Sequence, residues 1–232
     1  MDFTLSPLGD QAVVIEVARD ISIEAQDKVL AVSARLEERS PDWMVELVPA
    51  YTSVTVFYRL NAFVEGNPYE EVCKRIQQLL ASVQADRSSS RKTVRVPVLY
   101  GGEWGQDLPF VAEHNGLTLE EVISIHSSGE YLVHMIGFAP GFPFIGGMSE
   151  KIAAPRRKTP RLRIPARTVG IAGKQTGVYP IETPGGWQLI GRTPLELFLP
   201  EQDPPSLLAA GDRIEFYPIS QKEYDEMRGG RP

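Results

Sequence analysis

The apolar and polar positions of residues 1–92 predict a small domain in which strands and helices alternate. Clusters of β-branched residues predict strands at 11–17, 43–48, 53–58 and 93–99. Helices are expected after Ser22 and Asn67, because apolar residues recur behind each of these cap residues at three- and four-residue spacing. With the strand that follows residue 92, the order is β-α-β-β-α-β, which is typical of a split βαβ (ferredoxin-like) domain.

From Tyr100 onward the pattern changes, because glycine and proline become frequent. Two short helices are predicted first, at 108–114 and 118–126, and a capping box of Thr118 and Glu121 opens the second. Short β-branched or aromatic runs then alternate with Gly/Pro turns and predict strands at 131–136, 169–172, 187–190 and 213–217. Several short strands with this spacing are typical of a closed β-barrel.

The two patterns together predict an α+β protein of two domains. We expect the small α/β domain to span residues 1–92 and the β-barrel domain to span residues 93–232. The polar segment 85–92, Ala-Asp-Arg-Ser-Ser-Ser-Arg-Lys, is rich in residues that favour turns, and it is predicted to be a surface loop or linker.

Composition and charge limit the classes of function. The chain of 232 residues has a formal net charge of −6 and a pI of about 5.2, which argues against electrostatic binding to nucleic acid or an anionic membrane. No apolar run reaches the roughly 20 residues of a membrane-spanning helix. The N-terminus has no secretory signal, so a cytoplasmic location is expected. With Cys73 as the single cysteine, internal disulfides and thiolate zinc sites are excluded.

The three histidines match no compact metal motif, so no metal site is predicted. His114 and His126 are expected near helix ends, where a cation interacts favourably with the helix dipole. His134 lies on a predicted strand and is an acid–base candidate.

Three phenylalanines alternate with glycine and proline between Gly137 and Gly147. This segment cannot form a regular helix, because proline fixes φ and glycine favours irregular backbone. Two interpretations stay open: the rings plug one end of the barrel, or they form a pocket wall with free amide donors. Under the second interpretation, Phe138 and Phe142 contact a ligand. The segment is not a phosphate loop, because no Gly-Lys-Ser/Thr follows.

A basic cluster reverses the sign of charge locally in this acidic chain. It consists of Arg156, Arg157, Lys158, Arg161, Arg163 and Arg167, punctuated by Pro155, Pro160 and Pro165. One interpretation is a solvated basic edge. The other is contact with an anion or carboxylate, which guanidinium groups bind bidentately. Arg156 and Arg161, each preceded by a proline, are the candidates for that contact.

Polar side chains lie among glycines in the segments 170–180 and 183–193. They suit hydrogen bonding to a small amide or carboxylate in a concave, largely apolar site. These side chains are Gln175, Thr176, Tyr179, Gln188 and Arg192. Trp187 is expected to be a core ring, and Gly185 and Gly186 a hairpin turn. The sequence contains no Gly-x-Ser-x-Gly elbow.

These motifs occur in one specific order. They are Pro-Leu-Gly-Asp-Gln-Ala (7–12), Tyr-Gly-Gly-Glu-Trp-Gly (100–105), Gly-Phe-Ala-Pro-Gly-Phe-Pro-Phe (137–144), Ala-Pro-Arg (154–156), Thr-Pro-Arg (159–161), Ile-Ala-Gly-Lys-Gln-Thr-Gly-Val-Tyr-Pro (171–180) and Thr-Pro-Gly-Gly-Trp-Gln-Leu-Ile-Gly-Arg-Thr (183–193). Over nearly its full length the chain resembles the family of 5-oxoprolinase B subunits. That family includes the sporulation kinase A inhibitor and was long labelled allophanate hydrolase subunit 1.

The resemblance implies a cyclophilin-like β-barrel behind a smaller N-terminal α/β domain. It also implies ATP-dependent opening of 5-oxoproline to glutamate together with the A and C subunits, with ATP bound by, or shared with, those partners. A similar pair of domains in urea carboxylase suggests a site shared between B-like and C-like halves. Under this hypothesis the catalytic residues are Arg156, Arg161, Gln175 and Arg192. The substrate-binding residues are Phe138, Phe142, Thr176, Tyr179 and Gln188.

A second hypothesis, also based on the resemblance, is a regulator that binds a sporulation sensor histidine kinase and inhibits its autophosphorylation. A Phe-lined groove would receive a helical or proline-containing segment of the kinase. A third hypothesis, prolyl isomerase activity, rests on barrel shape alone.

Overall fold

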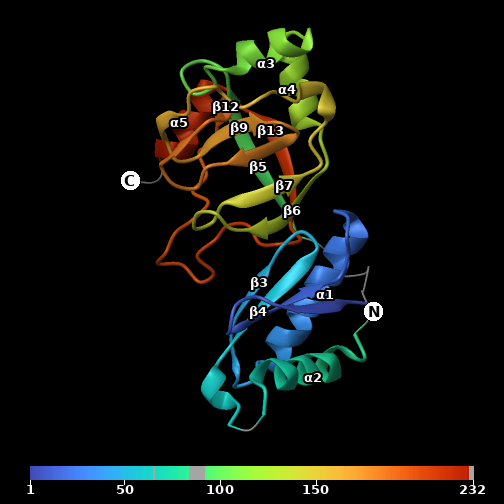
Figure 1. Ribbon diagram of the computed structural model, residues 1–232. Coiled ribbons are helices and arrows are strands. Elements are labelled where there is room, and N and C mark those ends of the chain that lie inside the picture. The colour runs from blue at the N-terminus through green and yellow to red at the C-terminus, as the bar shows by residue number, and fades with distance from the viewer. Residues whose placement is uncertain (65, 84–91, 230–232) are drawn as a thin grey trace. The chain divides into compact units, whose positions relative to one another are not determined.

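The computed structural model describes residues 1–64, 66–83 and 92–229 (Figure 1). The chain folds into two compact units, Met1–Ser90 and Arg91–Pro232. Apart from Lys92, the linker expected at 85–92 lies outside the described residues. No helix in the described ranges is long and apolar enough to cross a membrane.

The described part of the first unit contains a four-stranded antiparallel sheet in the order β1-β2-β4-β3. Its strands are β1 Thr4–Pro7, β2 Ala12–Glu16, β3 Met44–Pro49 and β4 Ser53–Tyr58. The helical elements are α1 Ile23–Arg39, η1 Leu60–Ala62 and α2 Pro68–Leu80. Side chains of β2, β4, α1 and α2 share one hydrophobic core, so both helices pack on the same face of the sheet.

The two predicted helix starts in this unit are confirmed. The Ser22 hydroxyl accepts a hydrogen bond from the backbone N–H of Ala25 at 3.0 Å. The Asn67 side chain accepts from the backbone N–H of Tyr69 at 3.0 Å, with proline next to the cap. Both side chains satisfy backbone donors that have no partner inside the helix.

The ferredoxin-like order expected for this unit is not confirmed. The strand predicted at 93–99 is β5, Thr93–Tyr100, which pairs with β13 and β12 in the second unit. The fourth place in the first sheet is taken by β1, a short and mostly exposed strand that the apolar pattern did not predict. Apolar alternation identifies a strand but carries no information about the sheet that it joins.

In the second unit, seven of the described strands close a barrel in the order β10-β7-β6-β13-β5-β12-β9 (Figure 1), which confirms the expected barrel. Besides β5, these strands are β6 Tyr131–Ile136, β7 Pro143–Gly146, β9 Thr168–Ala172, β10 Gln175–Val178, β12 Gln188–Arg192 and β13 Arg213–Pro218. β8 Arg161–Ile164 and β11 Thr183–Gly185 form a separate pair. The helical elements are α3 Leu108–Asn115, α4 Leu119–Ser127, η2 Glu150–Ile152 and α5 Gln221–Gly229. The α+β class is therefore confirmed, whereas the cyclophilin-like relationship stays a prediction.

The barrel interior contains a buried polar chain centred on His126. The Tyr100 hydroxyl donates to Nδ1 of His126 at 2.7 Å, and Nε2 lies 2.8 Å from the Thr176 hydroxyl oxygen. The Thr176 hydroxyl itself donates to the Gly170 carbonyl at 3.2 Å, so it accepts from His126 and the imidazole proton is assigned to Nε2. Burial lowers the pKa of His126 to about 3, and the ring is neutral at neutral pH.

The expected role of His126 as a cation near a helix end is therefore wrong. The residue does lie in the last turn of α4, but its side chain is fully buried between Tyr131 and Phe216 rather than turned toward the helix terminus. His114, in contrast, lies in the last turn of α3, and its exposed ring stacks on Phe110.

Candidate functional site

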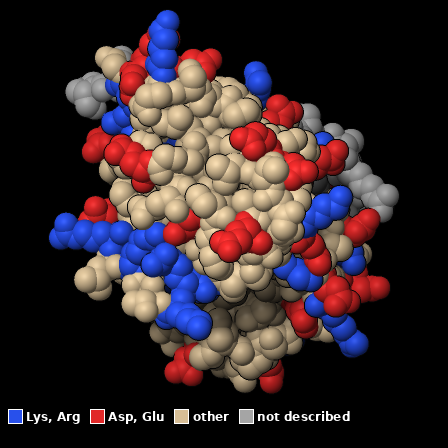
Figure 2. Space-filling model, turned by 90° about the horizontal axis from the view of Figure 1, so that it is seen from above, with Lys and Arg blue, Asp and Glu red and all other residues tan. Residues whose placement is uncertain are grey.

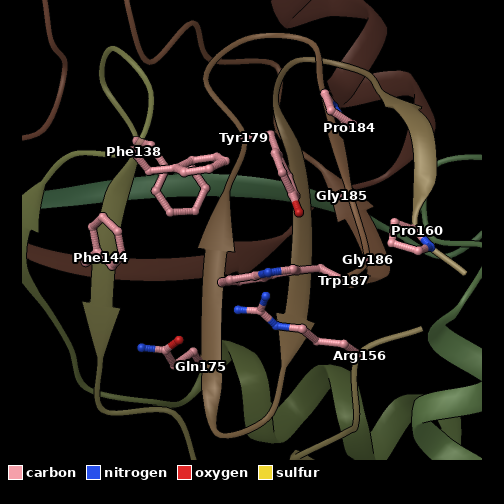
Figure 3. A pocket seen from close by; sticks show the side chains of 11 residues that line it. Phe138, Phe144, Arg156, Pro160, Gln175, Tyr179, Pro184, Gly185, Gly186 and Trp187 are labelled. Carbon is pink, nitrogen blue, oxygen red and sulfur yellow. The ribbon is translucent and has the colours of Figure 1, made fainter. Parts of the chain in front are cut away.

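A pocket of about 440 Å³ opens on the barrel unit (Figure 3). It is formed by the glycine-rich loop between β6 and β7, the proline-rich segment before β8, and the strands β10 and β11 with the residues around them. The lining residues are Phe138, Phe142, Phe144, Arg156, Pro160, Gln175, Tyr179, Pro184, Gly185, Gly186 and Trp187. Most of the wall is therefore aromatic or proline surface, with few polar groups, as is usual for small-molecule sites.

Phe142 is the centre of the aromatic wall. Its ring lies 5.5 Å from those of Phe138 and Phe144, 5.8 Å from that of Tyr179 and 6.1 Å from that of Trp187, in edge-to-face arrangements. Edge-to-face packing at these separations is the preferred geometry of aromatic pairs. The loop between Gly137 and Gly147 therefore forms a pocket wall, although the expected free amide donors are not confirmed, because the N–H groups of Gly137, Ala139 and Phe142 donate within the loop.

Phe138 has a strained and exposed conformation. Its φ is 69°, in the left-handed region that non-glycine residues seldom adopt, and its side chain is 74% exposed. Such strain costs free energy, and it is most often retained at ligand sites and switch regions. Phe138 is therefore held at the pocket mouth by its surroundings rather than by local preference.

Tyr179 contributes its phenol hydroxyl to the pocket wall. The residue is 2% exposed, and within the described residues its hydroxyl makes no hydrogen bond. Burial raises the pKa of this hydroxyl to about 12, against a lowering influence of Arg156 and Arg161. The phenol is consequently protonated at neutral pH and available as a hydrogen-bond donor. A Cβ atom at Gly185 would lie 2.7 Å from the hydroxyl oxygen, so only glycine fits beside it.

Arg156 is the positively charged group of the lining. It makes no hydrogen bond or ion pair within the parts of the chain that the structure describes, and Figure 3 shows its guanidinium group directed toward the same side of the pocket as Gln175. On the face drawn in Figure 2, Lys and Arg side chains gather most densely at the left border, and others lie at the top and right among Asp and Glu side chains. A guanidinium group without a protein partner suits an anionic ligand.

The neighbouring arginines, Arg157 and Arg161, share one buried carboxylate, Asp107. Its Oδ1 accepts from Arg161 at 2.8 Å and from Arg157 at 3.1 Å, and its Oδ2 accepts from the backbone N–H of Leu189 at 2.7 Å. The Asp107 side chain is 8% exposed. Arg161 also donates to the Trp187 carbonyl at 3.5 Å, so it supports the pocket wall instead of lining the pocket.

Replacement of Asp107 by asparagine should destabilise the chain by about 2 kcal/mol, because one carboxamide cannot replace all three charge-assisted hydrogen bonds. The partial exposure of Arg157 keeps the expected loss below that of a fully buried pair. Urea unfolding of the purified chain measures it. Glu150→Gln is the matched control, since the Lys174–Glu150 pair is about 70% exposed on both sides, and a change below about 0.5 kcal/mol is expected. Equal effects of the two substitutions would contradict the importance of the buried carboxylate.

Two other predicted site residues point away from the pocket. Thr176 is buried, and its hydroxyl takes part in the His126 chain of the barrel interior. Gln188 is also buried, and its amide donates to the Pro155 carbonyl at 2.7 Å. The structure therefore gives both side chains interior partners.

Arg192 lies in a different part of the barrel unit. Its Nε donates to the Ala166 carbonyl at 3.1 Å, and its guanidinium carbon lies 4.1 Å from the centre of the Trp104 ring. It does not line the pocket. Of the nine residues predicted for the site, the structure brings Phe138, Phe142, Arg156, Gln175 and Tyr179 together around one cavity.

Comparison with known proteins identifies the family of this chain. The family model for the carboxyltransferase domain, subdomains C and D, matches residues 3–208. The B subunit of 5-oxoprolinase from Bacillus subtilis is 50% identical over 228 residues, which cover 96% of this chain and 95% of that protein. The chain belongs to the family of 5-oxoprolinase B subunits.

Solved structures share the fold of this chain. A conserved uncharacterized protein from Pyrococcus horikoshii is 44% identical, with a TM-score of 0.56, and the match covers 95% of this chain and all of that protein. The match to the Kluyveromyces lactis urea carboxylase has a TM-score of 0.73. It covers 98% of this chain but only 23% of the urea carboxylase. At 20% identity this second likeness shows the fold alone.

Two residues that shape the site, Trp187 and Asp107, were not predicted to do so from the sequence. Trp187 was expected in the core, yet it is only partly buried and lines the pocket. Asp107 was missed entirely, because an aspartate just before a Leu-Pro helix start suggests a cap. In the structure its side chain caps nothing and binds the arginines instead. The one available signal was the surplus of arginines, which calls for a buried carboxylate.

His134 does not join the pocket. It lies on β6, 7% exposed, and a Cβ atom at Gly146 would lie 2.3 Å from its Nε2. The ring is therefore packed against the neighbouring strand. Among the described residues, no group of three or more His, Cys, Asp or Glu side chains is arranged to hold a metal ion.

Proposed function

We propose that this chain is one component of an ATP-dependent 5-oxoprolinase and that it opens 5-oxoproline to L-glutamate together with the A and C subunits. The observation that supports this most directly is an aromatic pocket that holds the Arg156 guanidinium and the Tyr179 hydroxyl, neither of which has a hydrogen-bond partner in the described ranges. Relatives named as B subunits of 5-oxoprolinase point to the same substrate.

5-Oxoproline is a flat five-membered lactam with one carboxylate, and each part has a counterpart in the pocket. The rings of Phe142 and Trp187 offer apolar surface to the lactam ring. The guanidinium of Arg156 binds the carboxylate bidentately. Because the pocket lining provides one uncompensated cation, it favours a ligand with a single negative charge.

Ring opening develops negative charge on the lactam oxygen when water adds to the carbonyl carbon. The Tyr179 hydroxyl is a protonated donor that would stabilise this charge, and Gln175 lies on the same pocket wall to orient the amide. The C–N bond then breaks, and the nitrogen takes a proton to give the amino group of glutamate. Arg161 acts on this site indirectly, by holding the carbonyl of Trp187.

The pocket residues do not fit ATP. A triphosphate carries several negative charges, whereas the lining contributes one free guanidinium and no lysine. The glycine-rich segment at 137–147 also has no following Gly-Lys-Ser/Thr. ATP therefore binds on a partner polypeptide in this proposal, and the ring opening described for the pocket residues does not pass through it.

The lining also has no carboxylate, imidazole or thiol among its eleven residues. A general base for the attacking water must come from elsewhere, and the open mouth beside Phe138 is where a partner polypeptide would add it. The family model describes two subdomains of a carboxyltransferase domain, which fits a chain that forms part of a shared site.

Reconstitution tests the proposal. The chain purified with the A and C subunits should release glutamate from 5-oxoproline only when ATP is present, and omission of this chain should abolish turnover. Undiminished glutamate release without it would overturn the proposal.

The alternative, inhibition of a sensor histidine kinase, stays a prediction. Unchanged kinase autophosphorylation at saturating concentrations of this chain would rule it out.

A further inference from the structure

A second cluster of charged groups lies outside the pocket. Arg228 Nη1 donates to Glu196 Oε1 at 2.8 Å, and Arg167 Nη1 lies 3.7 Å from the same oxygen. Arg192, stacked on Trp104, is close enough to both arginines that they lower its pKa, after burial as the largest cause. Glu196 is the one carboxylate that acts on Arg192 among the described residues. Three guanidinium groups and one carboxylate leave an excess of two positive charges.

Two donors of this cluster have no acceptor. Arg167 is 9% exposed, and its buried Nη1 makes no hydrogen bond in the described parts of the chain. Tyr224 lies near Arg192, and its hydroxyl makes no hydrogen bond in the same part of the chain, but unlike Arg167 Nη1 this oxygen is not a buried atom without a partner. A buried donor without an acceptor, such as Arg167 Nη1, is rare in folded proteins and calls for an explanation, of which an additional ligand is one.

The backbone also holds Arg167 in an unfavourable conformation. Its φ is 71°, in the left-handed region, although it is not a glycine. Its N–H donates to the Tyr179 carbonyl, and its own carbonyl accepts from Thr193 at 2.9 Å. These bonds fix the residue in a conformation that its side chain disfavours, and such strain is most often retained at ligand sites.

This cluster is separate from the pocket along the chain. Trp187 of the pocket wall precedes β12, whereas Arg192 is the last residue of that strand. At about 3.3 Å per residue, roughly 16 Å of extended chain lies between them. None of the three arginines is among the residues that line the pocket.

We propose that Arg167, Arg192 and Arg228 bind a phosphate group, either as inorganic phosphate or as part of a small phosphorylated molecule. A phosphate carries between one and two negative charges at neutral pH and accepts several hydrogen bonds, which match the charge excess and the open donors. This inference does not depend on the proposed function, because it concerns other residues and another ligand.

Titration of the full chain with inorganic phosphate at constant ionic strength, followed by calorimetry, tests it. Saturable binding of one phosphate per chain is expected, and Arg192→Gln should weaken it at least about tenfold, since a charge-assisted contact is lost. Glu196→Gln should strengthen binding severalfold, because it removes the competing carboxylate while the amide still accepts from Arg228. Arg156→Gln and Arg163→Gln, outside the cluster, should leave binding unchanged.

A stabilising role alone would give a different pattern. Absence of saturable phosphate binding by the unaltered chain would overturn the inference, as would an Arg192→Gln chain that is folded and binds normally. Should Arg192→Gln fail to fold, Glu196→Gln decides: tighter phosphate binding supports the site, and equal or weaker phosphate binding contradicts it.

Parallel titration with ADP distinguishes the two sources of the phosphate group. Tighter binding of ADP than of inorganic phosphate indicates a nucleotide phosphate, and equal or weaker binding indicates free phosphate. Failure of the reconstituted enzyme to turn over would leave these binding results unaffected.

Discussion

Arg156→Gln is expected to lower kcat/KM for 5-oxoproline about a hundredfold in the reconstituted complex. The guanidinium lines the pocket without a partner among the described residues, so its contacts are available for the substrate carboxylate. Loss of a charge-assisted, bidentate contact corresponds to about 2–3 kcal/mol, and about 1.4 kcal/mol is a factor of ten. Because the carboxylate does not react, most of the loss should appear in KM.

Two further variants sharpen this measurement. Arg156→Lys keeps the charge but loses the planar fork, and it should recover only part of the activity. Arg163→Gln removes an arginine of the same basic cluster whose side chain is 82% exposed and faces Glu182, and it should behave like the unaltered chain. Activity of Arg156→Gln within threefold of normal would show that the pocket does not bind the substrate carboxylate. The family assignment would survive that result.

The unfolding free energy is expected to fall by about 4 kcal/mol between pH 6.5 and pH 3 on account of His126 alone. In the folded chain the pKa of His126 is lowered to about 3 by burial, whereas the ordinary value is 6.5. As the pH falls below 6.5, His126 becomes protonated in the unfolded chain, whereas in the folded chain it stays neutral down to about pH 3. The stabilisation is therefore complete above pH 6.5 and is lost progressively below it, at about 1.4 kcal/mol per pH unit.

Comparison with His126→Gln isolates this contribution from carboxylates that titrate in the same range. The glutamine variant should be less stable at pH 7, since the Tyr100 hydroxyl loses its acceptor. The stability difference between the two chains should then shrink by about 2 kcal/mol between pH 6.5 and pH 5, because only the unaltered chain loses the histidine term. Urea unfolding at several pH values measures it. A difference that stays constant with pH would show that the folded chain binds a proton at His126 as readily as the unfolded chain does.

The series of hydrogen bonds through His126 also connects the barrel core with the pocket. Thr176, the hydrogen-bond partner of Nε2, follows Gln175 of the pocket wall directly on β10. Substitution of Thr176 should therefore affect stability before it affects substrate binding, contrary to the direct substrate contact expected from the sequence.

Features set by neighbouring residues were predictable from the sequence. The caps at Ser22 and Asn67 and the capping box at Thr118 each use a hydrogen bond across two or three residues, and all three are present. The strand at 131–136 and the aromatic loop after it also follow from local composition. The order of the motifs, which the sequence alone provides, was sufficient to recognise the family.

Features set by distant residues needed the tertiary structure. The sequence could not show that Asp107 binds Arg161, which is 54 residues away, and so could not tell which arginine is left for a ligand. It grouped Arg192 with Arg156 because both lie in glycine- and proline-rich motifs, whereas the barrel places Arg192 beside Trp104. The charge of a guanidinium group is fixed by its own chemistry, but whether that charge is neutralised depends on the carboxylate that the fold brings within about 3 Å.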